Sequence, residues 1–118
     1  MKKAREYVLY WKEILNLRDW HINIERTSKK GEMANIDVYG YDQDDLGPIE
    51  ARTATLQINF KEIGNYNELN KTILHEMLHV LLSKIVATPD NVTNDIAIEQ
   101  VIRTLEDAIW HFHLKAEE

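Results

Sequence analysis

The sequence predicts an α+β domain in which one helix, three short strands and two further helices follow one another. In three stretches, apolar residues recur every three or four positions, as on the buried face of a helix. Between the first two stretches, three short segments alternate apolar and polar residues, which is typical of half-buried strands. The chain has 118 residues, which suits one domain, residues 1–118, around a single core.

The first helix is expected over residues 5–17, with an apolar stripe formed by Val8, Trp11 and Leu15. The three alternating segments are expected to be strands at residues 20–24, 34–39 and 54–60. Lys29-Lys30-Gly31 is typical of a turn, and the acidic, glycine-containing residues 40–48 are typical of an exposed loop. We expect the strands to form one small, mostly antiparallel sheet.

Two longer helices complete the predicted domain. One is expected over residues 68–84, with Asn67 as its N-cap. The last is expected to begin at Thr93 or Asn94 and to run to about Lys115. Its apolar stripe consists of Ile98, Val101, Ile102, Leu105, Ile109 and Phe112.

The pentapeptide His75-Glu76-Met77-Leu78-His79 lies in the second predicted helix, in an apolar stretch without Gly or Pro. Positions i and i+4 of a helix share one face, so both imidazoles can reach one Zn²⁺ at roughly 2.0–2.1 Å. Glu76 lies beside the metal and can take a proton from the metal-bound water. The pentapeptide therefore predicts zinc-assisted hydrolysis of a peptide bond.

A catalytic zinc usually takes three protein ligands and leaves a fourth position to water. The pattern H-E-x-x-H-x-x-G-x-x-H is excluded as the source of the third, because Leu82 and Ile85 stand at its glycine and last histidine positions. Glu99 is the candidate, since it lies 20 positions after the second histidine, beside the apolar stripe of the last helix. Asp95, one turn earlier, and Glu106, about two turns later, are the alternatives.

This arrangement resembles the gluzincin metallopeptidases, in which the third zinc ligand is a glutamate on a helix after the H-E-x-x-H motif. The chain is similar to minimal single-domain gluzincins and to short metallopeptidase-like proteins of phage and prophage genomes. The resemblance implies a zincin-like fold, a Zn²⁺ cofactor held by His75, His79 and Glu99, and a protein or peptide substrate. It also implies that residues 54–58 form the edge strand beside the cleft, where an extended substrate can pair.

By the same resemblance, Glu76 is the general base of a zinc metallopeptidase, and it passes its proton on to the leaving amine. A donor beside the zinc would stabilise the oxyanion. Four residues are candidates for that role, and the sequence does not select among them: Tyr39, Tyr41, Tyr66 and His111.

Two further features are judged against the gluzincin pattern. Many gluzincins carry an acidic residue four positions after the ligand glutamate, where it supports a histidine. This chain has Arg103 there, so Asp95 or Glu106 would have to substitute. Some minimal gluzincins are latent because a terminal segment occupies the cleft, and residues 110–118 are the candidate for such self-inhibition here.

Composition excludes several other classes. The net charge of −6 disfavours direct binding of nucleic acid, which needs clustered Lys and Arg. The chain has no cysteine, which excludes disulfides and thiolate ligands. No stretch approaches the 18 apolar residues expected of a membrane span, and the N-terminus lacks the pattern of a secretory signal. We therefore expect a cytoplasmic protein.

Three alternatives to a peptidase are weighed. The first is a catalytically silent, zinc-stabilised protein-interaction module of the same fold. The second is that His75 and His79 are an ordinary i,i+4 pair on a helix surface, since the short motif can arise by chance. The third is peptide deformylase, which shares the pentapeptide but needs a cysteine ligand, and the absence of cysteine excludes it.

Overall fold

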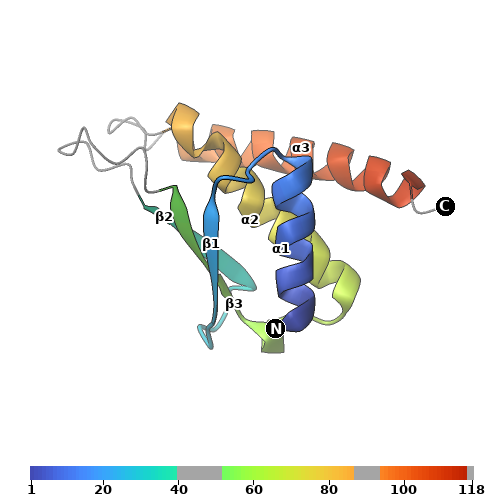
Figure 1. The fold of residues 1–118 in the computed structure, drawn as a ribbon. Helices are drawn as coiled ribbons and strands as arrows, with labels where there is room; N and C mark the ends of the chain where they lie inside the picture. The colour runs from blue at the N-terminus through green and yellow to red at the C-terminus, as the bar shows by residue number, and fades with distance from the viewer. Residues whose placement is uncertain (40–51, 87–93, 117–118) are drawn as a thin grey trace.

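The computed structural model describes residues 1–39, 52–86 and 94–116. These residues form three α-helices and one three-stranded sheet in an α+β fold, which confirms the predicted class (Figure 1). The expected loop at residues 40–48 lies outside the described residues. In chain order the elements are α1 (Lys2–Ile14), β1 (His21–Arg26), β2 (Ala34–Tyr39), β3 (Thr53–Ile58), the 3-10 helix η2 (Phe60–Glu62), α2 (Tyr66–Val86) and α3 (Asn94–Ala116).

The sheet is mixed, so the expectation of a mostly antiparallel sheet is wrong. Its strand order is β1-β3-β2, with β3 parallel to β1 and antiparallel to β2. The last strand suits the position between the first two because it is the one strand of the three without a charged residue, and a central strand has a neighbour on both sides. Its sequence Thr-Ala-Thr-Leu-Gln-Ile has no charged residue, whereas β1 carries Glu25 and Arg26 and β2 carries Asp37.

The two faces of the sheet differ, as the alternating segments predict. On one face, Ala54, Leu56 and Ile58 of β3 are fully buried. Cross-strand partners on this face include Ile24 of β1 and Ile36 of β2, and both are partly buried against the core. The opposite face carries polar side chains, among them His21, Asn23, Glu25, Asp37 and Gln57. One face therefore receives the helices, and the other is polar and largely exposed, with Thr55 at its centre buried.

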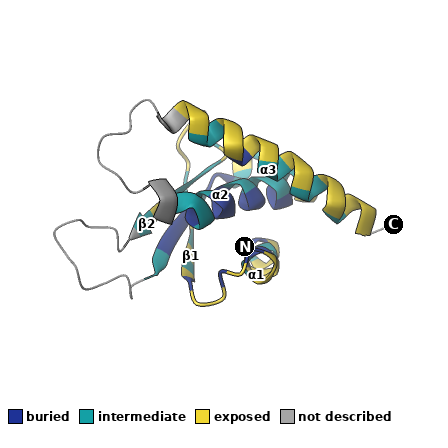
Figure 2. Cartoon of the chain, turned by 90° about the horizontal axis from the view of Figure 1, so that it is seen from above, coloured by how far each residue is buried: buried dark blue, intermediate teal, exposed yellow. Residues whose placement is uncertain are grey.

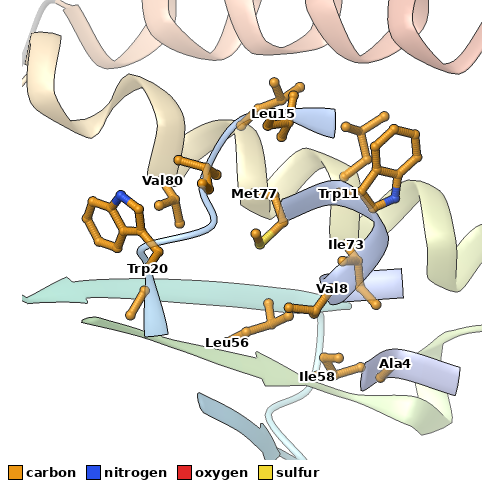
Figure 3. Close-up of a cluster of buried hydrophobic side chains, with 14 of the residues drawn as sticks. Ala4, Val8, Trp11, Leu15, Trp20, Leu56, Ile58, Ile73, Met77 and Val80 are labelled. Atoms are coloured by element: carbon orange, nitrogen blue, oxygen red, sulfur yellow. The ribbon is translucent and has the colours of Figure 1, made fainter. Parts of the chain in front are cut away.

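Helices α1 and α2 supply most of the remaining core (Figure 3). Val8 and Trp11 of α1 and Ile73 and Met77 of α2 lie within it, all nearly inaccessible to solvent. The Trp11 indole Nε1 donates to Oδ1 of Asn70 at 2.6 Å, which satisfies two buried polar groups between these helices. Helix α2, which carries the predicted motif, is therefore held by both α1 and the sheet.

The N-cap of α2 is Asn65, and the expectation of Asn67 is wrong. The Asn65 side chain accepts a hydrogen bond from the backbone N–H of Glu68 at 2.8 Å. The Glu68 carboxylate in turn accepts from the backbone N–H of Gly64 at 3.4 Å. This reciprocal arrangement satisfies backbone donors at the start of the helix, and it places the first turn two residues earlier than the periodicity indicates.

Helix α3 packs across α2 and leaves one side to solvent (Figure 2). Ile102 is fully buried, and Ile98, Leu105 and Ile109 are partly buried. Val101 and Phe112, predicted members of the same stripe, are exposed. The buried apolar stripe of α3 is narrower than expected, because over most of its length α3 packs against one element, α2. No helix among the described residues is both long and apolar enough to cross a membrane.

Candidate metal centre

The two histidines and Glu99 meet at the contact between α2 and α3. His75 and His79 lie one turn apart on α2, with ring centroids 5.1 Å apart. Glu99, near the start of α3, places its carboxylate against both rings, with Oε1 2.8 Å from His79 Nε2 and Oε2 3.5 Å from His75 Nε2. The structure therefore brings together all three residues that the sequence nominated as metal ligands.

This donor set fits a divalent metal ion. The three residues offer ligand atoms that all lie within 4.8 Å of one another. Around a tetrahedral zinc with bonds of roughly 2.0–2.1 Å, ligand atoms are about 3.4 Å apart, so only small side-chain shifts would be needed. Two imidazoles and one carboxylate are ligands that Zn²⁺ commonly takes, and they leave one position open.

Glu106 holds the ring of His75 from the side opposite Glu99. Its Oε1 lies 2.5 Å from His75 Nδ1, and its side chain is only 13% exposed. A carboxylate at Nδ1 favours the proton on that nitrogen and leaves Nε2 free to bind a metal. Glu106, considered above as an alternative ligand or as a support, occupies the supporting position. It follows Glu99 by two helical turns, so both carboxylates face α2.

Lys71 anchors this second carboxylate. Its Nζ lies 3.7 Å from Glu106 Oε2 and 3.4 Å from Asp107 Oδ1. Lys71 precedes His75 by one turn of α2, so the ammonium group and the imidazole contact opposite oxygens of Glu106. Arg103 stands where many gluzincins carry an acidic residue. It points into solvent, 71% exposed, with Nε 4.0 Å from Glu99 Oε2.

Glu76 is the most buried carboxylate of the group, with 8% of its surface exposed. Burial, followed by the negative charges of Glu99, Glu32 and Glu106, raises the pKa of Glu76 from 4.5 to about 8. Without a cation, this side chain is therefore mostly protonated at neutral pH. A metal ion beside it would favour the carboxylate and lower that pKa again. Several acidic groups around two imidazoles are thus an environment that a cation would stabilise.

The pKa of His79 is lowered from 6.5. The largest cause is burial, which Glu99 opposes and the neighbouring His75 reinforces. A lowered pKa keeps the imidazole neutral at physiological pH, and only the neutral ring can bind a metal. Both pKa shifts are thus compatible with a metal ligand at His79 and a proton-accepting group at Glu76.

A cleft of about 510 Å³ opens over these residues. The strand beside it is β2, which contributes Ala34, Ile36 and Val38, while Leu82 and Ile98 line it from the helices. The expectation that residues 54–58 form this edge strand is wrong, because β3 is the central strand. This expectation and that of a mostly antiparallel sheet are wrong for the same reason, because β3 lies between β1 and β2.

None of the four candidate oxyanion donors is shown at the cleft. Tyr41 and the side chain of Tyr39 lie outside the described residues, as does the side chain of Asp95. Among the described residues, the cleft lining includes neither Tyr66 nor His111. It does include two polar residues that the sequence did not indicate, Asn35 and Ser83. No sequence pattern indicates that they line a cleft, because Asn35 lies on a strand far from the motif and Ser83 lies one helical turn after it.

Residues 110–116 continue α3 as a helix. His113 Nδ1 lies 3.0 Å from the Tyr10 hydroxyl of α1, and its ring packs near Trp110 and Trp11. Among the described residues, none of this segment lines the cleft. Self-inhibition by the tail therefore stays a prediction, and this conformation does not support it.

Comparison with known proteins assigns no relative: no protein-family model matches the chain, and searches of curated proteins and of solved structures find no match.

The contact between Glu106 and His75 predicts the effect of a single substitution. Glu106→Gln keeps the size of the side chain but removes the charge that holds His75 Nδ1–H. We expect zinc affinity to fall about 10- to 100-fold, the range for groups that support a ligand histidine. Competition with a chromophoric chelator measures the change. Asp107→Asn is the matched control, because Asp107 contacts Lys71 but not His75. Equal affinities in both variants would contradict this role.

The raised pKa of Glu76 predicts a pH-dependent stability of the metal-free protein. Glu76 binds its proton more tightly in the folded chain, so the stability it contributes is lost as pH rises from 4.5 toward about 8. Below pH 6.5, His79 has the opposite effect, because its pKa is lowered in the folded chain. Above pH 6.5, the free energy of unfolding should therefore fall by up to about 1.4 kcal/mol per pH unit. Urea unfolding between pH 6.5 and 8 should show this slope in wild type, and a shallower slope in Glu76→Gln. Parallel profiles would contradict the assignment.

Proposed function

We propose that this protein is a zinc-dependent metallopeptidase that hydrolyses peptide bonds, with Glu76 as general base. One observation carries the proposal: a buried glutamate stands between two histidines that converge with Glu99 at one wall of a cleft. An ordinary pair of surface histidines would require neither the buried carboxylate nor the third ligand from another helix. The zincin-like fold is part of the same proposal, supported by a motif helix packed on the helix face of a small sheet.

Hydrolysis is favoured over other metal chemistry by the position of Glu76. Two histidines and one carboxylate also suit Fe²⁺ in oxygenases. A buried carboxylate beside the metal is what hydrolysis requires, because water must lose a proton as it attacks. The proposed cofactor is therefore Zn²⁺, held by His75 Nε2, His79 Nε2 and Glu99.

When bound, Zn²⁺ would supply Lewis-acid chemistry, lowering the pKa of a coordinated water toward about 7 and polarising the scissile carbonyl. Glu76 accepts the proton of the attacking water and later gives it to the leaving amine. Glu106 keeps His75 in the tautomer with a free Nε2, and Lys71 holds Glu106 in place. Burial of Glu76 keeps bulk water from competing for its proton.

Among the described residues, the outer edge of β2 has no partner strand, and this supports an extended peptide as substrate. Asn59 N–H donates to the Met33 carbonyl at 2.8 Å, so in this antiparallel pair Met33 and every second residue after it face β3. The backbone groups of Ala34, Ile36 and Val38 therefore point away from β3, and the same residues line the cleft. A substrate strand could add to β2 there, with its scissile bond directed at Glu76 and the metal ligands.

Glu76→Gln separates the peptidase from a silent zinc-binding module. Without its base, the enzyme should lose about 10²- to 10⁴-fold in peptide hydrolysis, while zinc binding persists. A fluorogenic peptide library gives the rate, and zinc content is measured on the same samples. Glu32→Gln is the matched control. It removes another acidic side chain that acts on Glu76, but one outside the ligand set, so its rate should stay within a few fold.

Two results would overturn the peptidase. Full activity in Glu76→Gln would exclude this residue as the base. Zinc binding without hydrolysis of any library peptide, and with no change of cellular function in Glu76→Gln, would assign the silent interaction module instead.

A further inference from the structure

The second free edge of the sheet, that of β1, presents unpaired backbone groups. His21 N–H donates to the Arg52 carbonyl and Thr27 N–H to that of Ile58, so alternate residues from His21 onward face β3. The backbone N–H and C=O groups of Ile22 and Ile24 therefore point outward. Among the described residues, β1 pairs with β3 alone. The middle of β1, Ile22-Asn23-Ile24, has no proline and no charged residue. Such residues usually prevent an edge strand from pairing with another chain.

A groove of about 580 Å³ runs between this edge and α1. Figure 1 shows α1 and β1 side by side, with the chain running in opposite directions. Arg5, Leu9 and Lys12 line the groove from α1, on successive turns of one helix face. Leu9 is 65% exposed, so the groove offers an apolar side chain between the two cations.

The charge of this groove is positive. Arg5 and Lys12 have no carboxylate partner among the described residues. Glu25 is the one acidic residue of the lining, and its carboxylate accepts from Gln57 on the polar face of the sheet, away from α1. The β2 edge differs, because Glu76 and Glu99 line the cleft beside it. The two free edges thus favour segments of opposite charge.

We propose that the groove between α1 and β1 binds an extended, acidic segment of a partner protein, which adds to β1 as a further strand. Arg5 and Lys12 are about 10 Å apart along the helix axis. Residues i and i+4 of a strand point to the same side and are about 13 Å apart. Two acidic residues at that spacing can therefore contact Arg5 and Lys12. The long side chains of Arg5 and Lys12 accommodate the difference between the two spacings. An apolar residue at i+2 covers Leu9.

The recognised pattern is therefore acidic-x-apolar-x-acidic. Backbone pairing with β1 supplies affinity, and the three groups on α1 supply specificity. None of these residues belongs to the metal centre, so this interaction does not depend on the proposed peptidase activity.

The probe is the acetylated, amidated peptide Thr-Glu-Thr-Val-Thr-Glu-Thr, titrated into ¹⁵N-labelled protein and followed by amide chemical shifts. The Glu76→Gln protein is used so that the peptide is not cleaved. We expect the outward amides of Ile22 and Ile24 to shift more than those of Asn23 and Glu25. Arg5→Glu with Lys12→Glu should weaken binding at least tenfold. Lys2→Glu with Lys3→Glu makes the same charge change on α1 outside the groove, and should weaken it less than threefold.

Four outcomes would overturn the proposal. The first is no shift with millimolar peptide. The second is equal weakening by both pairs of substitutions, which indicates attraction by charge alone. The third is equal binding of a peptide with Lys in place of Glu. In the fourth, the β1 amides shift with protein concentration and without peptide, which assigns the edge to a second copy of the chain.

Discussion

The packing of α3 against α2 is the contact on which the candidate site depends. A helix alone can place two imidazoles one turn apart, but it cannot supply the third ligand at the required distance. Ile102, fully buried, fixes α3 on α2. Glu99 then lies one turn before it and Glu106 one turn after it, against opposite sides of the histidine pair. The same contact therefore fixes both the candidate ligand set and the orientation of His75.

The charges at the contact between α2 and α3 favour the binding of a cation. Burial, followed by the negative charges of Glu99, Glu32 and Glu106, raises the pKa of Glu76 to about 8. Such a group of carboxylates is unfavourable in a metal-free interior and favourable around a divalent cation. Lys71 offsets part of the charge, but from the outer side of Glu106. The β1 edge, at the other side of the sheet, carries cations instead, so the two strand edges of one small domain differ in the segments they favour.

The sequence predicted best those properties that depend on a single helix or strand. Helical periodicity and alternation predict the elements and both faces of the sheet, and the motif spacing nominates His75, Glu76, His79 and Glu99. Properties that need several elements at once were missed. Strand order depends on competition between strands for the central position, so β3 was mistaken for an edge. The support of His75 by Glu106 depends on the rotation of α3, which leaves several acidic residues equivalent in sequence, and the cap at Asn65 depends on side-chain geometry.

The metal content of the purified protein tests whether α2 and α3 together form a three-ligand zinc site. Wild type, His79→Ala and Glu99→Ala would be purified in parallel and analysed by plasma mass spectrometry, each with its folding checked by circular dichroism. We expect about one zinc per wild-type chain and loss of zinc in both folded variants. Full zinc in Glu99→Ala would remove α3 from the ligand set. No zinc in wild type, even after zinc is added, would exclude the zinc site and the peptidase that depends on it.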